Sequence, residues 1–395
     1  MNILEEIQNC PIEWKELGEV CEIETGKLNA NESVEDGKYP FFTTAKEISR
    51  INSFRWDTEA LLIAGNANVG DVKYYSGKFE AYQRTYVLTN FSNNVKARFL
   101  LHIIKQGLKS YLENNTNKAA MSYIVISTLK SFPIPIPPVE IQEKIVQILD
   151  KFTDYVTELT SELTSRKKQY SYYRDKLLSF EDEVYQVEWK MLDVVSEKTT
   201  NISWNKIGDD EKFKYIDLSS VDRFSNKIIE TTSITKLTAP SRAQKIVKSD
   251  DIILGTTRPT LKRFTKITDD YNDQICSTGF YVFRTNGQVL PNYVYHIFSS
   301  SDFYKYLEEN QSGASYPAIS DALVKKYKIP VPSLEIQSRI VQVLDNFDMV
   351  CNDLNIGLPK EIELRQKQYE YFREKLLTFV AEGEYTDSTV QTRHH

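Results

Sequence analysis

The sequence has few cysteines and no long hydrophobic run. Its 395 residues include four cysteines, scattered without CxxC spacing, at Cys10, Cys21, Cys276 and Cys351. This pattern argues against a disulfide framework and against a zinc site, so we expect reduced, structural cysteines. No run of about 18 apolar residues occurs, which argues against a membrane helix. Residues 1–6 also lack the basic start and apolar run of a signal peptide, and together these absences predict a cytoplasmic protein.

Signatures of catalysis are missing or incomplete. Residues 65–70 have the glycine spacing of a phosphate-binding loop, but Asp71 stands where the lysine is required. No Asn-Pro-Pro-aromatic tetrapeptide, the usual signature of an amino-methyltransferase, occurs. His102 and His296 lie in apolar stretches and are expected to be packed helix residues rather than ligands or bases. The sequence therefore predicts a chain with no catalytic residues, no metal site and no bound cofactor.

Two Glu-Trp-Lys triplets, at 13–15 and 188–190, have the E-x-K form found in some nucleases. No metal-binding aspartate can be identified beside them, and each triplet stands at the start of a repeat. A structural role is therefore favoured, and a metal-dependent nuclease stays open as an alternative.

The sequence does contain a second copy of much of itself. Residues 140–180 recur as 335–379, and the two Glu-Trp-Lys triplets and the Tyr-Leu-Glu triplets at 111–113 and 306–308 extend the match upstream. The second copy of the helix has gained residues around 357–359. The chain is thus two copies of one unit, a globular part followed by a helix, and at 41% hydrophobic residues it can bury two cores.

Each copy ends in a segment that predicts a long helix. In the first copy, apolar residues recur at steps of three and four, the spacing of a coiled-coil seam, at Ile145, Ile148, Phe152, Tyr155 and Leu159. A helix over 140–180 would be about 60 Å long, too long for an ordinary small domain to cover. The other copy is the obvious partner, while two amphipathic helices buried in separate cores remain the alternative.

These features predict two copies of a mixed α/β (α+β) domain joined by two long antiparallel coiled-coil helices, with pseudo-twofold symmetry. The predicted parts are a first domain at 1–139, a first helix at 140–180, a second domain at 181–334, a second helix at 335–380 and a tail at 381–395.

The net charge of −6 argues against a nucleic-acid binder until its distribution is considered. Between Lys73 and Lys118 eight basic residues face two acidic ones, and the same holds between Lys236 and Lys266. Both clusters lie largely in the middles of the two units, which share little beyond a strand-like run, 61–63 before Gly65 and 252–254 before Gly255. An ordinary solvated face remains the alternative.

Groups suited to base edges accompany these clusters. Lysine and arginine neutralise phosphates, whereas arginine, asparagine and glutamine can make bidentate contacts with bases. The predicted DNA-contacting residues are Asn66, Asn68, Lys73, Lys78, Gln83 and Arg84 in the first unit and Arg242, Lys245, Thr256, Thr257, Arg258, Lys262 and Arg263 in the second.

The junctions between domain and helix carry a family resemblance. Their sequences, IPIPPVEIQ at 134–142 and IPVPSLEIQ at 329–337, together with the order domain, helix, domain, helix, resemble the specificity subunit of type I restriction-modification enzymes. The resemblance covers essentially the whole chain. It departs at Ser333, where the first copy has Pro138, and at 357–359, which interrupts the second helix.

The resemblance implies that each domain reads one half of a split target in double-stranded DNA, and that the helices space the domains and help to dock two methyltransferase subunits. Those subunits would bring S-adenosylmethionine and methylate adenine N6, and a restriction subunit using ATP and Mg²⁺ would complete the enzyme. The expected docking residues are Gln142, Arg174, Gln337 and Arg373. A coiled-coil scaffold that does not bind DNA is the main alternative.

Overall fold

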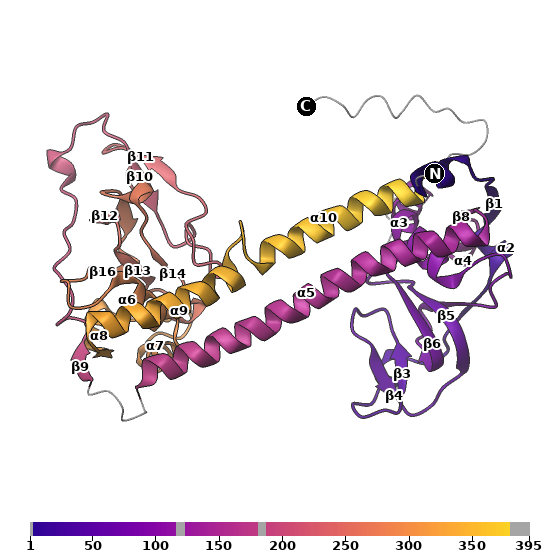
Figure 1. Ribbon diagram of the computed structural model, residues 1–395, viewed down its shortest axis with the longest axis horizontal. Coiled ribbons are helices and arrows are strands. Elements are labelled where there is room, and N and C mark those ends of the chain that lie inside the picture. The colour runs from indigo at the N-terminus through magenta and orange to yellow at the C-terminus, as the bar shows by residue number, and fades with distance from the viewer. Residues whose placement is uncertain (1–2, 116–122, 181–186, 380–395) are drawn as a thin grey trace. The chain divides into compact units, whose positions relative to one another are not determined.

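The computed structural model describes residues 3–115, 123–180 and 187–379. The chain divides into two compact units, Met1–Thr157 with Leu364–His395, and Glu158–Glu363 (Figure 1). Each unit holds one domain of mixed helices and strands together with sections of the long helices, so the predicted mixed class is confirmed. Lys118 and the predicted tail, 381–395, lie outside the described residues.

The first unit is built on a six-stranded sheet of order β2-β7-β5-β6-β3-β4. Its strands are β2 Glu22–Thr25, β3 Tyr39–Phe42, β4 Ser49–Ile51, β5 Trp56–Ala64, β6 Val72–Ala81 and β7 Thr85–Thr89. Alternation along β5 sends Leu61 and Ile63 into the main core, which they share with the buried face of α3 (Ala97–Asn115). Leu62 points the other way, into a smaller core with Phe42. The short helices are α1 Ile3–Asn9, α2 Leu17–Val20 and α4 Ile126–Lys130.

The second unit places its seven central strands in two sheets, of order β14-β13-β16 and β11-β10-β15-β12. The strands are β10 Phe213–Ile216, β11 Thr232–Ile234, β12 Ala243–Ile246, β13 Ile252–Gly255, β14 Phe264–Lys266, β15 Ile275–Ser277 and β16 Phe280–Phe283. The helices beside them are α6 Pro291–Ser299, α7 Ser301–Asn310 and α8 Asp321–Lys326. Leu254 faces Tyr281 across β13 and β16, as Ile63 faces Tyr86 across β5 and β7. The shared frame predicted from the repeat is therefore present in the strands.

The glycines that follow the matched strands are not equivalent to each other. The Ile124 amide donates to the Gly65 carbonyl, and the Ile319 amide donates to the Thr256 carbonyl. Gly65 therefore corresponds to Thr256, and the sequence pairing of Gly65 with Gly255 is one residue out of register.

The Glu-Trp-Lys triplets form edge strands that close each domain. Strand β1 (Glu13–Glu16) pairs with β8 (Pro133–Ile136), and β9 (Glu188–Met191) pairs with β17 (Lys328–Val331). Trp14 faces Pro135 as Trp189 faces Pro330. Over the described residues, no group of three or more His, Cys, Asp or Glu side chains is arranged to hold a metal ion. The strand pairing of both triplets supports the structural role that the sequence favoured.

The first long helix is continuous and the second is broken. Helix α5 spans Val139–Ser179, whereas α9 (Leu334–Asn352) and α10 (Leu358–Leu377) are separated by a turn at 353–357. The Asp353 carboxylate accepts the amides of Asn355 and Ile356 and so stabilises this turn. A Cβ on Gly357 would lie 2.5 Å from the Met349 carbonyl oxygen, so glycine is required there. The second helix, expected over 335–380 with an interruption at 357–359, is therefore two helices, and the break covers 353–357.

The long helices pair with each other in both units. In the first unit α5 and α10 run antiparallel, and the rings of Phe152 and Phe372 stack with centroids 5.2 Å apart (Figure 1). In the second unit the equivalent residues, Phe347 of α9 and Tyr173 of α5, stack at 5.8 Å. These duplicated contacts favour the coiled coil over two unconnected helices. Among the described helices, none combines the length and the apolar character needed to cross a membrane.

Candidate nucleic-acid interface

Each domain carries an equivalent loop at the end of its central strand, 65–71 after β5 and 256–263 after β13, which we call the strand-end loops. Ala67 and Arg258 occupy corresponding positions and both have left-handed backbone, with φ of 57° and 50°. Asn66 pairs with Tyr123 in an isolated bridge, as Thr257 pairs with Ala318. The same backbone frame therefore displays different side chains in the two domains.

Arg258 and Lys262 project from the second strand-end loop with defined orientations. The Arg258 guanidinium lies 4.6 Å from the ring centre of Tyr316, and its backbone amide donates to the Pro317 carbonyl. The Lys262 ammonium lies 4.0 Å from the ring centre of Tyr304, and burial, followed by the nearby charge of Arg174, lowers its pKa. Both residues remain exposed, so their cationic groups are available for phosphates or base edges.

Three predicted DNA-contacting residues of the second unit instead make internal bonds. Lys245 forms an ion pair with Asp321 at 2.8 Å, and the Thr256 hydroxyl donates to the Gly279 carbonyl. Arg263 donates to the Leu218 carbonyl at 2.9 Å. These three side chains therefore stabilise the loop and its surroundings rather than project into solvent. Of the other predicted residues, Thr257 is half-buried beside Arg258, and Arg242 is exposed in the turn just before β12.

In the first unit the structure brings Asn66, Gln83 and Arg84 together. The Gly65 amide donates to the Arg84 carbonyl, which places the exposed turn of Gln83 and Arg84 beside the strand-end loop. Gln83 donates to the Asn29 side chain at 3.0 Å. The Asn66 side-chain oxygen is buried and has no hydrogen-bond partner.

The other three predicted residues of the first unit are tied elsewhere. Asn68 donates to the Thr44 carbonyl at 2.7 Å, and Lys73 pairs with Asp71 at 2.9 Å. Lys78 lies 4.7 Å from the Phe54 ring centre. Val72 is the residue of β6 that pairs with β5 next to the strand-end loop, and Lys78 lies six residues further along β6. Lys78 is therefore about 20 Å from the strand-end loop.

Sequence reasoning missed the hairpin loops that flank the strand-end loops. These are the β3–β4 connection, 43–48, and the β10–β11 connection, 217–231. Both hairpins start from a strand that pairs in parallel with its neighbour, β3 with β6 and β10 with β15. Thr44 accepts from Asn68 in the first, and Leu218 accepts from Arg263 in the second. No periodic signal marks these loops, since they have no regular structure.

The glutamines expected to dock a partner are internal ties. Gln142 and Gln337 are fully buried at the starts of α5 and α9. The Gln142 amide donates to the carbonyls of Asn94 and Pro137, and its oxygen accepts the Lys96 amide. Gln337 repeats this pattern with Gln288, Pro332 and Leu290. Each glutamine therefore fastens a helix to its own domain and offers no surface to a partner protein.

The expected docking arginines lie against tyrosine rings. Arg174 is buried, with its guanidinium 5.4 Å from the Tyr170 ring centre and an ion pair to Asp175 at 2.9 Å. Arg373 takes the same position over Tyr369, also at 5.4 Å. The same arginine–tyrosine contact therefore holds the arginine side chain against the helix in both copies.

A buried histidine also ties each domain to its long helices. His102 Nε2 lies 3.0 Å from Asp150 of α5, and His296 Nε2 lies 2.7 Å from Asp345 of α9. Burial lowers the pKa of His102, although the carboxylate opposes this shift. The expectation that both histidines are packed helix residues is confirmed.

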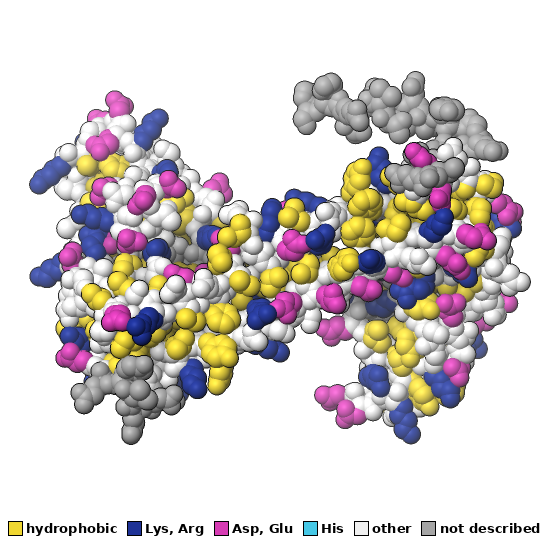
Figure 2. All heavy atoms as spheres, in the orientation of Figure 1, with side chains coloured by type: hydrophobic (Ala, Val, Ile, Leu, Met, Phe, Trp, Pro, Cys, Tyr) yellow, Lys and Arg dark blue, Asp and Glu magenta, His cyan; other side chains and the backbone are white. Residues whose placement is uncertain are grey.

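A different set of duplicated residues is exposed. Trp14 and Trp189 are 40% and 51% exposed, and Tyr172 and Tyr371 are 61% and 55% exposed. Steps of four place each tyrosine on one helix face between two lysines, Lys168 and Lys176 on α5 and Lys367 and Lys375 on α10. We call these the duplicated Trp-Tyr surfaces. Figure 2 shows hydrophobic side chains gathering over the C-terminal parts of α5 and α10.

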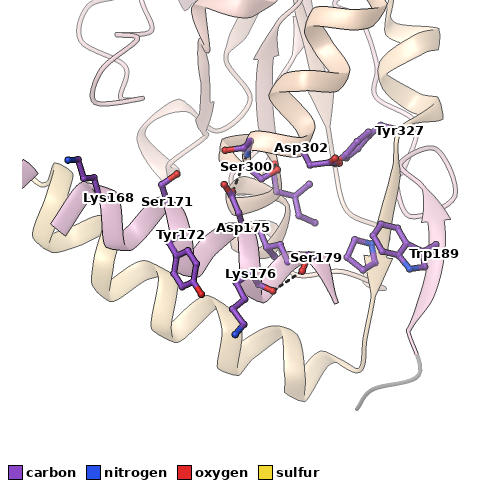
Figure 3. Close-up of a pocket in the computed structure, with 14 residues that line it drawn as sticks. Lys168, Ser171, Tyr172, Asp175, Lys176, Ser179, Trp189, Ser300, Asp302 and Tyr327 are labelled. Carbon is purple, nitrogen blue, oxygen red and sulfur yellow. Dashed lines mark hydrogen bonds between the residues drawn. The ribbon is translucent and has the colours of Figure 1, made fainter. Parts of the chain in front are cut away.

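In the second unit this surface borders a groove of about 1120 Å³ between α5, α7 and β9 (Figure 3). Tyr172 and Lys176 line one wall, and Trp189 and Tyr327 line the other. The Asp175 carboxylate accepts the Ser301 amide at the base of the groove. The groove thus combines exposed rings with charged groups, the mixture typical of protein interfaces.

Comparisons with known proteins agree on one family. A family model described as the type I restriction modification DNA specificity domain matches residues 11–166 and 188–364, one match in each repeat. The specificity subunit of the Escherichia coli type I restriction enzyme EcoR124I/EcoR124II is 35% identical over 276 residues, which span 63% of each protein. The specificity subunit of the E. coli enzyme EcoDI is 26% identical, over 90% of this chain and 87% of its own length.

The fold also matches a solved structure. The S subunit of a type I restriction-modification system from M. genitalium aligns with a TM-score of 0.61 at 17% identity, over 94% of this chain and 98% of that one. At this identity the match concerns the fold, and the fold includes both domains.

Proposed function

The chain belongs to the type I restriction modification DNA specificity family, and from this we propose that each of its two domains reads one half of a bipartite, asymmetric target in double-stranded DNA. Its predicted place as a non-catalytic specificity subunit of a methyltransferase and restriction complex is confirmed by the family. The scaffold and nuclease alternatives are set aside.

The observation that carries the proposal is the pair of equivalent loops with different chemistry. At matching backbone positions the first domain presents Asn66 and Ala67, and the second presents Thr257 and Arg258. An arginine guanidinium suits guanine, and the first loop has no cation at the matching position, Ala67. Two readers on one frame with unlike side chains would recognise unlike half-sites.

The partners that we propose are two methyltransferase subunits, docked on the duplicated Trp-Tyr surfaces. Exposed residues that are identical in two otherwise diverged copies serve a task common to both. Aromatic rings flanked by lysines would bury well against an apolar and acidic face of a partner. S-adenosylmethionine would be held by those subunits, and ATP and Mg²⁺ by a restriction subunit, all in the cytoplasm.

Methylation mapping tests the reading of DNA. In cells that carry the chain and its methyltransferase, we expect N6-methyladenine at one bipartite sequence that is unmodified when the gene is deleted. Exchanging residues 189–330 for the block of a relative should change one half-site and leave the other intact. A change in both halves would contradict independent readers.

Stoichiometry tests the docking surfaces. Tyr172→Ala with Lys176→Glu should remove one of two methyltransferases from the purified complex, and Tyr371→Ala with Lys375→Glu should remove the other. Analytical ultracentrifugation reports the lost mass. Tyr155→Ala is the matched control, because Tyr155 is exposed on α5 but has Val350 as its counterpart. Two methyltransferases retained in both double variants would refute this location.

A further inference from the structure

The β10–β11 connection holds an aromatic ring out in solvent. Phe224 is 75% exposed at the tip of this loop. The Asp222 carboxylate accepts the amides of Phe224 and Ser225, and the Asp222 amide donates to the Lys227 carbonyl. These hydrogen bonds hold the pKa of Asp222 below its ordinary value. The ring is therefore displayed by an ordered turn.

This tip is fastened to the second strand-end loop. Arg263 donates to the Leu218 carbonyl at the start of the connection. When the Asn226 side-chain amide is turned so that both its nitrogen and its oxygen have suitable partners, its nitrogen donates to the Lys262 carbonyl at 3.0 Å. The loop that carries Arg258 and Lys262 and the turn that carries Phe224 therefore move as one surface.

The charge beside the ring is positive. The Arg223 guanidinium lies 4.7 Å from the Phe224 ring centre, and the cations of the strand-end loop follow on the same surface. The shorter β3–β4 connection of the first domain also carries an exposed apolar side chain, Ile48, at 50%. Both hairpin connections thus present an apolar side chain to solvent.

We propose that Phe224 is a wedge that enters the base stack of the half-site read by the second domain. The inference rests on the proposed function and adds to it. Apolar side chains such as phenylalanine, leucine and isoleucine unstack base steps when a cationic surface holds the duplex against them. The proposal commits to DNA as the occupant, because the Arg223 guanidinium lies at the ring and the turn is fastened to the loop that carries Arg258 and Lys262.

The test measures binding of the complete complex with its methyltransferases to a duplex carrying the mapped target. Phe224→Ala should weaken binding about 5- to 150-fold, the range for loss of one base–aromatic stack. The slope of affinity against salt should not change, because no phosphate contact is lost. Phe224→Leu should retain most of the affinity. Leu237→Ala is the control, since Leu237 is 79% exposed and follows β11 at the end opposite the hairpin.

Abasic substitutions locate the wedge. An abasic nucleotide at the wedged step, found by scanning the second half-site, should restore Phe224→Ala binding, because that step no longer has to be unstacked. Equal affinity of wild type and Phe224→Ala for the target would overturn the wedge while leaving the proposed function intact. Loss of a methyltransferase from the Phe224→Ala complex would also overturn it, since the ring would then contact protein. A wild-type complex that does not distinguish the target from other DNA would instead refute the proposed function.

Discussion

Lys262 and Arg258 make separable predictions about binding. If the Lys262 ammonium neutralises one phosphate, then Lys262→Ala should lower the slope of log affinity against log salt by about 0.9. Between about 50 and 200 mM salt this corresponds to about a 3.5-fold smaller change in affinity. The loss should be the same on every DNA sequence. Arg263 is not expected to contribute a further unit of slope, because its guanidinium bonds to the Leu218 carbonyl.

Arg258 should behave differently if it reads a base. Its replacement by alanine should cost about 1–3 kcal/mol at the mapped target and relax one position of the second half-site. Binding to unrelated DNA should change little. The stacking of its guanidinium on Tyr316 supports this assignment, because a preoriented group loses less entropy when it binds.

Fluorescence anisotropy titrations of the complete complex at several salt concentrations separate the two effects. Lys325→Ala is the control, since Lys325 lies on α8 with 45% of its side chain exposed and pairs with Asp193 at 2.9 Å. An unchanged salt slope in Lys262→Ala would refute the phosphate contact. A uniform loss over all sequences in Arg258→Ala would show that this residue does not read a base.

Three further predictions concern the frame. Inserting four residues after Leu163, with a matching insertion in the second helix, should lengthen the coil by about 6 Å. Since DNA rises about 3.4 Å per base pair, methylation should move to a target whose spacer is longer by one or two base pairs. Methylation only at the old spacing would show that the helices do not set the distance between the half-sites. Because the pKa of His102 is lowered from 6.5 in the folded state, the contribution of this histidine to stability should be complete above about pH 6.5 and should decline below it. If the melting temperature of His102→Asn depends on pH in the same way as that of the wild type, this prediction is wrong. Asp251→Ala removes the buried partner of the half-buried Arg284 and should cost about 3–5 kcal/mol in urea unfolding. A loss near zero would show that this ion pair does not stabilise the fold.

The duplicated frame could be predicted because its signals are local or repeated. Identical residues at the domain–helix junctions and the three-four spacing after Ile145 identified two units and two long helices. The sequence indicated an interruption of the second helix at 357–359 but not the turn itself, at 353–357, because a glycine near a proline can either end a helix or be tolerated inside it. The structure decides this through the 2.5 Å approach that a Cβ on Gly357 would make to the Met349 carbonyl.

The candidate site could be predicted only in part, because charge counts do not reveal partners that are distant in sequence. Lys245 and Asp321 are far apart in the chain and form one ion pair. Arg263 is similarly occupied by Leu218. Arg258 and Lys262 remain available only because their left-handed backbone turns them outward, and periodicity contains no information about that conformation.

The two kinds of repeated residue have different consequences for how such a chain can diverge. Gln142 and Gln337, and the histidines that meet Asp150 and Asp345, are identical because each fastens a helix to a domain. The tryptophans and tyrosines of the duplicated Trp-Tyr surfaces are instead exposed, and the partner docking that we propose would account for their identity. Apart from the residues that anchor them, the strand-end and hairpin loops neither fasten a helix to a domain nor form part of the duplicated Trp-Tyr surfaces. Substitution there changes the chemistry presented to a ligand without loosening the frame, which is the property that a reader of exchangeable half-sites requires.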